Sequence, residues 1–104
     1  KRQGRYVLKR LKQYNGIAQE SNNKETLDAI LLLAKTEGIF TEPAGGVSVA
    51  VLKKMVEDGQ IDKDETTVCY VTGNGLKATE SIMEVLSRPE VMQPDVAKIS
   101  AVVK

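Results

Sequence analysis

The sequence predicts an α/β fold with four helices and one secure β-strand. Two kinds of pattern carry this prediction. Apolar residues recur at helical spacing in four stretches, whereas residues 67–72 form an uncharged run rich in β-branched and aromatic side chains. Helices that alternate with a buried strand are typical of α/β architecture. Because one strand cannot make a sheet, we expect the neighbouring strands to lie elsewhere in a longer parent chain.

A basic helix is predicted over residues 5–14. Its apolar residues recur at helical spacing, and the following Asn15-Gly16 supplies a left-handed residue that can close a helix. The first twelve residues contain six Lys or Arg and no acid, a pattern also found in helices that bind nucleic acid. Aromatic residues make up only 4% of the chain and the net charge is +1, so we favour a solvated helix face.

Glycine and proline signals bound the second and third helices. Asn22 and Glu25 have the spacing of a capping box, which predicts a second helix that ends at Gly38. Pro43 precedes a third helix that ends at Gly59. The face of this helix that we expect to pack against the strand comprises Val51, Leu52, Met55 and Val56.

The predicted strand leads into a turn and a fourth helix. Residues 67–72 are expected to form a central strand that is covered on both faces. A glycine turn at 73–75 follows, and residues 78–87 carry the apolar face of the fourth helix. The tail at 88–104 fits either a short helix begun at Pro94 or an edge strand.

Composition narrows the classes of function. A chain of 104 residues with 41% hydrophobic and 28% charged residues is typical of one globular unit. The absence of His excludes imidazole-dependent catalysis within the chain, and Cys69 alone can form neither an internal disulfide nor a metal cluster. We therefore predict no metal site. No apolar run approaches the ~20 residues of a membrane span. Lys1 starts neither a signal peptide nor a translated chain, so we expect a longer parent.

The glycine turn is the main candidate for a binding site. Gly73 and Gly75, with Ala78, formally match the dinucleotide-binding fingerprint, but no second strand with an acidic residue follows ~20 positions later. Thr72 would present a hydroxyl at the end of the strand, where the two glycines would admit a planar ligand. A tight turn without a ligand explains the same residues. Glu42, at the start of the third helix, is either a solvated cap or a carboxylate aimed into a cleft.

Two blocks of sequence are specific: AKTEGIFTEPAGGVSVAVLKK at residues 34–54 and VTGNGLK at 71–77. In this order and spacing they closely resemble the carboxyl-terminal part of threonine synthases, which are fold type II pyridoxal-phosphate enzymes of the tryptophan-synthase-β-like class. The resemblance implies that residues 1–87 are the carboxyl-terminal segment of the larger, cofactor-binding domain, in which helices flank a parallel sheet. Residues 88–104 form a separate tail that resembles the family only loosely.

The resemblance also implies a reaction and a cofactor. Threonine synthases are carbon-oxygen lyases that use pyridoxal phosphate to convert O-phosphohomoserine and water to L-threonine and phosphate. The Schiff-base lysine precedes this segment in the family, so no catalytic residue is assigned here and Lys77 is not that lysine. The resemblance assigns the Thr72 hydroxyl to the pyridine nitrogen, Gly73 and Gly75 to the approach of the ring, and Glu42 to the wall of the cofactor pocket.

The implied partners are the rest of the parent chain, the small-molecule substrate and a second copy in a homodimer, without nucleic acid or membrane. The expected location is the cytoplasm, or the plastid in a plant, and the segment alone is expected to be inactive. Two alternatives stay open. A threonine or serine dehydratase shares the fold, although the Gly-Leu-Lys at residues 75–77 favours threonine synthase. The other alternative is a small stand-alone binding or regulatory module with a basic first helix.

Overall fold

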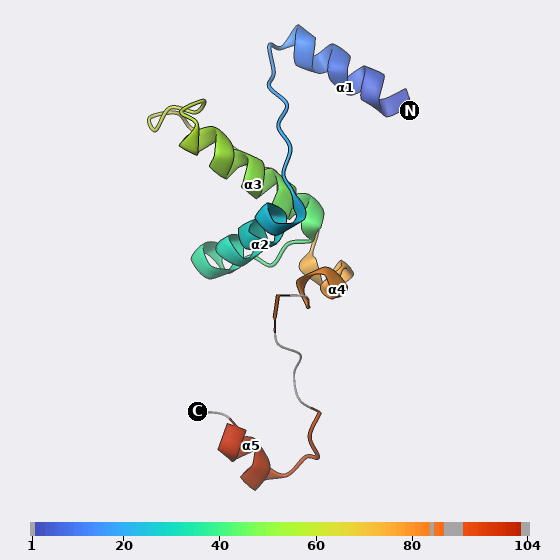
Figure 1. Ribbon diagram of the computed structural model, residues 1–104, viewed down its shortest axis with the longest axis vertical. Helices are drawn as coiled ribbons and strands as arrows, with labels where there is room; N and C mark the ends of the chain where they lie inside the picture. Colours follow the sequence, from blue (N-terminus) through green and yellow to red (C-terminus); the bar gives the residue numbers. More distant parts are fainter. Residues whose placement is uncertain (1, 84, 87–90, 103–104) are drawn as a thin grey trace.

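The computed structural model describes residues 2–83, 85–86 and 91–102. The described elements are α1 (Arg2–Gln13), α2 (Asn23–Glu37), α3 (Pro43–Glu57), the 3-10 helix η1 (Gly75–Lys77), α4 (Thr79–Ile82) and α5 (Val96–Val102). A central pair, α2 and α3, lies between α1 and α5, which project away from it in opposite directions (Figure 1). The radius of gyration is 18.6 Å, against about 13 Å for a compact domain of 100 residues. The chain is therefore elongated, and its core is confined to the centre.

The core forms where α2 and α3 pack through small residues. Ala29 and Ile30 of α2 and Ala50 of α3 are buried. A Cβ atom added to Gly46 would lie 2.7 Å from a side-chain carbon of Ile30, so this glycine lets the two helices approach closely. Gly46 and Ala50 thus belong to the face of α3 that packs against α2, which the sequence patterns did not predict. Of the face predicted to pack against residues 67–72, Val51, Leu52 and Met55 are half-buried, whereas Val56 is exposed.

The predicted carboxyl-terminal ends of the first two helices and the predicted capping box are confirmed, whereas α1 begins at Arg2, three residues before the predicted start. The side chain of Asn22 accepts a hydrogen bond from the Glu25 amide at 2.9 Å, and the Glu25 carboxylate accepts one from the Asn22 amide at 2.8 Å. The Asn22 amide and the Lys54 ammonium, 2.9 Å away, both lower the pKa of Glu25, the amide more strongly. The left-handed conformation predicted after α1 is at Asn15, with φ of 52°, and α2 ends at Gly38, with φ of 67°.

Helix α1 stands apart from the core, and its apolar residues are not covered by the described part of the chain. Tyr6, Val7, Leu8 and Tyr14 are all exposed. The guanidinium of Arg10 lies over the ring of Tyr6, 5.0 Å from its centroid, and donates a hydrogen bond to the Tyr6 hydroxyl at 3.0 Å. The predicted helix is therefore present, but its apolar residues pack against no other helix in the described part of the chain.

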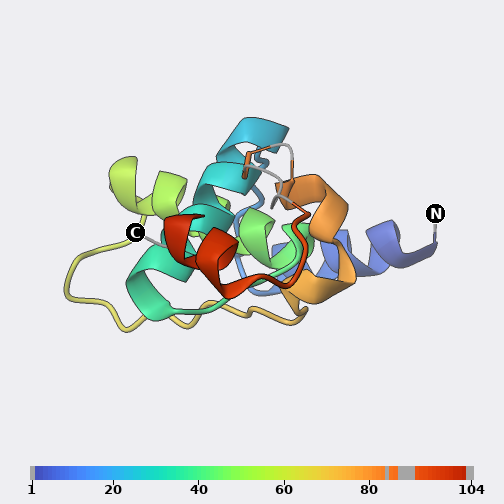
Figure 2. The ribbon, with the colours of Figure 1, turned by 90° about the horizontal axis from the view of Figure 1, so that it is seen from below.

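The predicted strand is not formed in the described chain. Residues 67–72 run as extended backbone beside the helices, without strand pairing (Figure 2). Val68 and Tyr70 are 72% and 78% exposed, so the predicted burial on both faces is wrong for this structure. β-branched side chains favour extended backbone, but a strand also needs a neighbouring strand for its hydrogen bonds. The described part of the chain is helical, and the predicted α/β class is not confirmed by it.

The fourth helix is shorter than predicted. Of the predicted residues 78–87, α4 covers only Thr79–Ile82. The 3-10 helix η1 precedes it in the glycine turn, where the Asn74 side chain accepts a hydrogen bond from the Leu76 amide at 2.9 Å. Ile82 of α4 is buried, and Ser81 lines a small hollow together with Thr26 and Pro43 from the starts of α2 and α3. Residues 84 and 87 of the predicted helix lie outside the described residues.

The tail contains a helix rather than an edge strand. Asp95 begins α5, since its carboxylate accepts a hydrogen bond from the Ala97 amide at 2.9 Å. Residues 88–90 and 103–104 of the tail lie outside the described residues. Among the described helices, none combines the length and the hydrophobicity that crossing a membrane requires.

Candidate functional site

The two specific sequence blocks lie side by side in the structure. The Glu42 amide donates a hydrogen bond to the Gly73 carbonyl at 3.3 Å, and the Gly75 amide donates one to the Phe40 carbonyl at 3.0 Å. Thr41 and Asn74 therefore face each other in an isolated antiparallel bridge. This bridge places the glycine turn against the start of α3, and it brings Glu42, Gly73 and Gly75 together as one candidate site.

Thr41 is a buried residue that links the two sequence blocks. Its side chain is 1% exposed, and its hydroxyl donates a hydrogen bond to the Gly73 carbonyl at 2.9 Å. A Cβ atom at Gly45 would overlap this hydroxyl, so the glycine provides the space that the hydroxyl needs. The sequence analysis missed Thr41. The signal that could have found it is Gly45, a glycine four residues later in the first turn of a helix.

Glu42 directs its carboxylate toward the glycine turn. It occupies the N-cap position of α3, but its side chain makes no capping hydrogen bond. Only its backbone carbonyl serves the helix, by accepting hydrogen bonds from the Gly45 and Gly46 amides at 3.0 and 3.1 Å. The half-buried carboxylate lies against Gly73, and the Lys77 ammonium is 3.5 Å from it. Of the two predicted alternatives, the structure disfavours the solvated cap.

The two glycines of the turn are required by their protein neighbours. A Cβ atom at Gly73 would overlap the Glu42 carboxylate, and one at Gly75 would lie 2.6 Å from carbons of the Phe40 ring. Neither glycine has a positive φ, so close approach and not backbone conformation explains the residue type. The turn is thus fitted to residues 40–42.

Replacing Gly73 by alanine is expected to displace the Glu42 side chain, because the new methyl group takes its place. The expected loss is about 1 to 3 kcal/mol in the free energy of unfolding, the usual cost of overpacking. Urea denaturation of the protein measures it. In a Glu42→Ala background the same change should cost less than half as much. Equal costs in both backgrounds would show that Glu42 does not fill this space.

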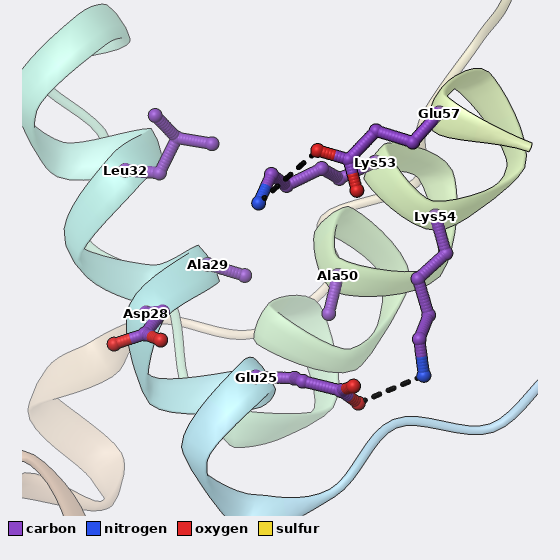
Figure 3. A pocket seen from close by; sticks show the side chains of 8 residues that line it. All are labelled: Glu25, Asp28, Ala29, Leu32, Ala50, Lys53, Lys54 and Glu57. Atoms are coloured by element: carbon purple, nitrogen blue, oxygen red, sulfur yellow. Dashed lines mark hydrogen bonds and ion pairs between the residues drawn. The ribbon is translucent and has the colours of Figure 1, made fainter.

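A second hollow lies away from this site, on the open side of the α2–α3 pair (Figure 3). It has a volume of about 330 Å³. Four of the five charged side chains that line it pair with each other: the Lys54 ammonium lies 2.9 Å from Glu25, and the Lys53 ammonium lies 3.4 Å from Glu57. The fifth, Asp28, pairs with Lys24. No group of acidic or cysteine side chains among the described residues is placed to hold a metal ion.

Comparison with known proteins decides the family. Residues 1–73 match the family of pyridoxal-phosphate dependent enzymes. The chain belongs to this family. The matched range includes Glu42, Thr72 and Gly73, so three of the four predicted cofactor-binding residues lie within it.

The curated proteins similar to this chain include threonine synthases, which confirms the resemblance found in the sequence. The threonine synthase of Methanocaldococcus jannaschii is 39% identical over 86% of this chain and 22% of its own length. That of Halalkalibacterium halodurans is 40% identical over 86% of this chain and 26% of its own length. That of a Bacillus species is 46% identical over 69% of this chain and 20% of its own length. The chain spans about a quarter of the length of these relatives.

The hydroxyl of Thr72 has the chemistry that a pyridoxal-phosphate ring nitrogen could use. Thr72 is exposed beside the fixed turn, and none of the described residues forms a hydrogen bond with its side chain. A neutral hydroxyl can pair with a pyridine nitrogen. The carboxylate that lies against the turn, that of Glu42, is paired with Lys77. The donor set is therefore compatible with a ring nitrogen bound by a neutral partner.

Proposed function

We propose that residues 1–87 are the carboxyl-terminal segment of the cofactor-binding domain of a threonine synthase, with residues 88–104 as its tail. The identity of 37–46% with threonine synthases over most of this chain is the observation that supports it. The activity belongs to a longer enzyme, which converts O-phosphohomoserine and water to L-threonine and phosphate. We propose that this enzyme is a homodimer in a reducing compartment, the cytoplasm or a plastid. The single free Cys69 supports such a compartment.

Each residue of the site has a separate role in this proposal. Bound pyridoxal phosphate supplies the electron sink for negative charge that develops on the substrate. The Thr72 hydroxyl binds the ring nitrogen and, unlike an Asp, leaves that nitrogen without a held proton. Gly73 and Gly75 carry no side chains and therefore leave room for the ring to approach the turn. Glu42 forms part of the pocket wall, and its pairing with Lys77 supports the assignment of Lys77 to a structural role.

The full-length enzyme separates threonine synthase from the dehydratase alternative. Purified enzyme is incubated with O-phosphohomoserine, and with threonine and serine in separate reactions. Phosphate and threonine should appear together in equal amounts in the first reaction. Formation of a 2-oxo acid from threonine or serine, without phosphate release from O-phosphohomoserine, would overturn the proposal in favour of a dehydratase.

The isolated chain tests the role of this segment. It is expected to show no saturable visible absorbance with pyridoxal phosphate beyond that of its surface lysines, because neither the Schiff-base lysine nor the phosphate cup of the family matches residues in this chain. A stoichiometric absorbance would contradict the segment assignment. Cooperative folding together with binding to nucleic acid would favour the stand-alone module.

A further inference from the structure

We infer that Thr41 is the positioning residue that holds Thr72 toward the ring nitrogen of pyridoxal phosphate. This inference rests on the proposed function of Thr72 and adds a residue that neither the sequence patterns nor the resemblance assigns. Thr41 does not itself touch the ring. It acts through the hydrogen bond that its buried hydroxyl donates to the Gly73 carbonyl.

Because a glycine follows Thr72, the backbone at this position must be held by hydrogen bonds from another part of the chain. Glycine has the widest range of backbone conformations, so Gly73 alone cannot fix the residue before it. Its carbonyl accepts two hydrogen bonds, from the Thr41 hydroxyl at 2.9 Å and from the Glu42 amide at 3.3 Å. The Thr41 bond is the shorter of the two. Together they fix the backbone on the carboxyl side of Thr72.

Thr41 is itself held firmly. A β-branched side chain has few rotamers, and burial against Gly45 at the start of α3 removes the remaining freedom. The ion pair between Glu42 and Lys77 is a weaker constraint, since its partners are 3.5 Å apart and the Lys77 side chain is 68% exposed. Thr41 is fixed at the start of α3 and holds the Gly73 carbonyl. The position of α3 therefore determines the position of Thr72.

The test compares Thr41→Val and Thr41→Ser in the full-length enzyme. Valine keeps the branched shape without the hydroxyl, whereas serine keeps the hydroxyl. Apoenzyme is titrated with pyridoxal phosphate, and the dissociation constant and the visible absorption maximum are recorded. We expect Thr41→Val to weaken cofactor binding about threefold to tenfold, as for one lost hydrogen bond, and to shift the maximum in the same direction as Thr72→Val. Thr41→Ser should restore both values.

Thr26→Val is the matched control. Thr26 is also a buried threonine, and its hydroxyl donates to a backbone carbonyl, that of Asn22, at 2.9 Å. This bond lies within the first turn of α2 and does not contact the glycine turn. The control should lower stability without moving the absorption maximum. Equal effects of Thr26→Val and Thr41→Val on the cofactor would overturn the inference by showing a merely structural role.

The remaining outcomes separate the inference from the proposed function. If Thr72→Val impairs binding and Thr41→Val behaves like the parent, the inference fails and the proposed role of Thr72 stands. If Thr72→Val itself behaves like the parent, both fail. Should Thr41→Val not fold, Thr41→Cys decides, because its thiol fits the same space and is a weaker donor. Weakened binding with a shifted maximum then supports the inference, and parent-like values overturn it.

Discussion

Replacing Thr72 by valine in the full-length enzyme is expected to lower the affinity for pyridoxal phosphate, or turnover, by one to two orders of magnitude. Valine keeps the branched shape at this position but, on the proposed role of Thr72, leaves the pyridine nitrogen without its hydrogen-bond partner. An unmade hydrogen bond costs ~1 to 3 kcal/mol, and ~1.4 kcal/mol corresponds to a factor of ten. Titration of the apoenzyme with cofactor and steady-state assays at saturating cofactor measure the two quantities.

Thr72→Ser is the matched variant, because it retains the hydroxyl and removes only a methyl group. It should lose much less affinity than Thr72→Val. If both variants behave like the parent, Thr72 does not contact the ring. Equal damage by both would mean that the site needs the shape of the side chain, and Thr72 would be only the residue that leads into the turn.

Replacing Ile30 by alanine should cost about 2 to 5 kcal/mol in the free energy of unfolding, the usual range for truncating a large buried aliphatic residue. Ile30 is 2% exposed and contacts the glycine face of α3 at Gly46. Urea denaturation followed by circular dichroism measures the loss. Leu32→Ala is the control on the same helix, because Leu32 is 41% exposed and should cost about 1 kcal/mol or less. Similar costs at both positions would contradict this assignment of the core.

Features that depend on a few neighbouring residues were predictable from the sequence. The capping box of Asn22 and Glu25 forms as predicted, because both partners lie within one helical turn. The left-handed residues Asn15 and Gly38 likewise act within their own helix ends. The strand at 67–72 was not predictable in this way. Its formation depends on hydrogen bonds from a distant strand, which the described residues do not supply.

The site was predictable in part. The resemblance pointed to Glu42 and the glycine turn, and the structure brings them together, although the contact of Thr72 with a cofactor stays a prediction. Thr41 escaped notice because its importance comes from burial and from a carbonyl 32 residues away. The face of α3 that packs against α2 was not predicted for a related reason. Hydropathy patterns favour large side chains, whereas the close approach of the two helices depends on Gly46 and Ala50.

The span of the Thr41–Gly73 hydrogen bond has a consequence for the order of folding. Helices α2 and α3 are joined by a short connection, while this bond closes a loop between residues 32 positions apart. The entropy lost on closing a loop rises by about 0.6 kcal/mol for each doubling of its length. The helical pair can therefore assemble first, with the glycine turn docking afterwards. In the native protein the turn should open while α2 and α3 stay paired, so the edge that is proposed to meet the cofactor forms after the helical pair and comes loose before it.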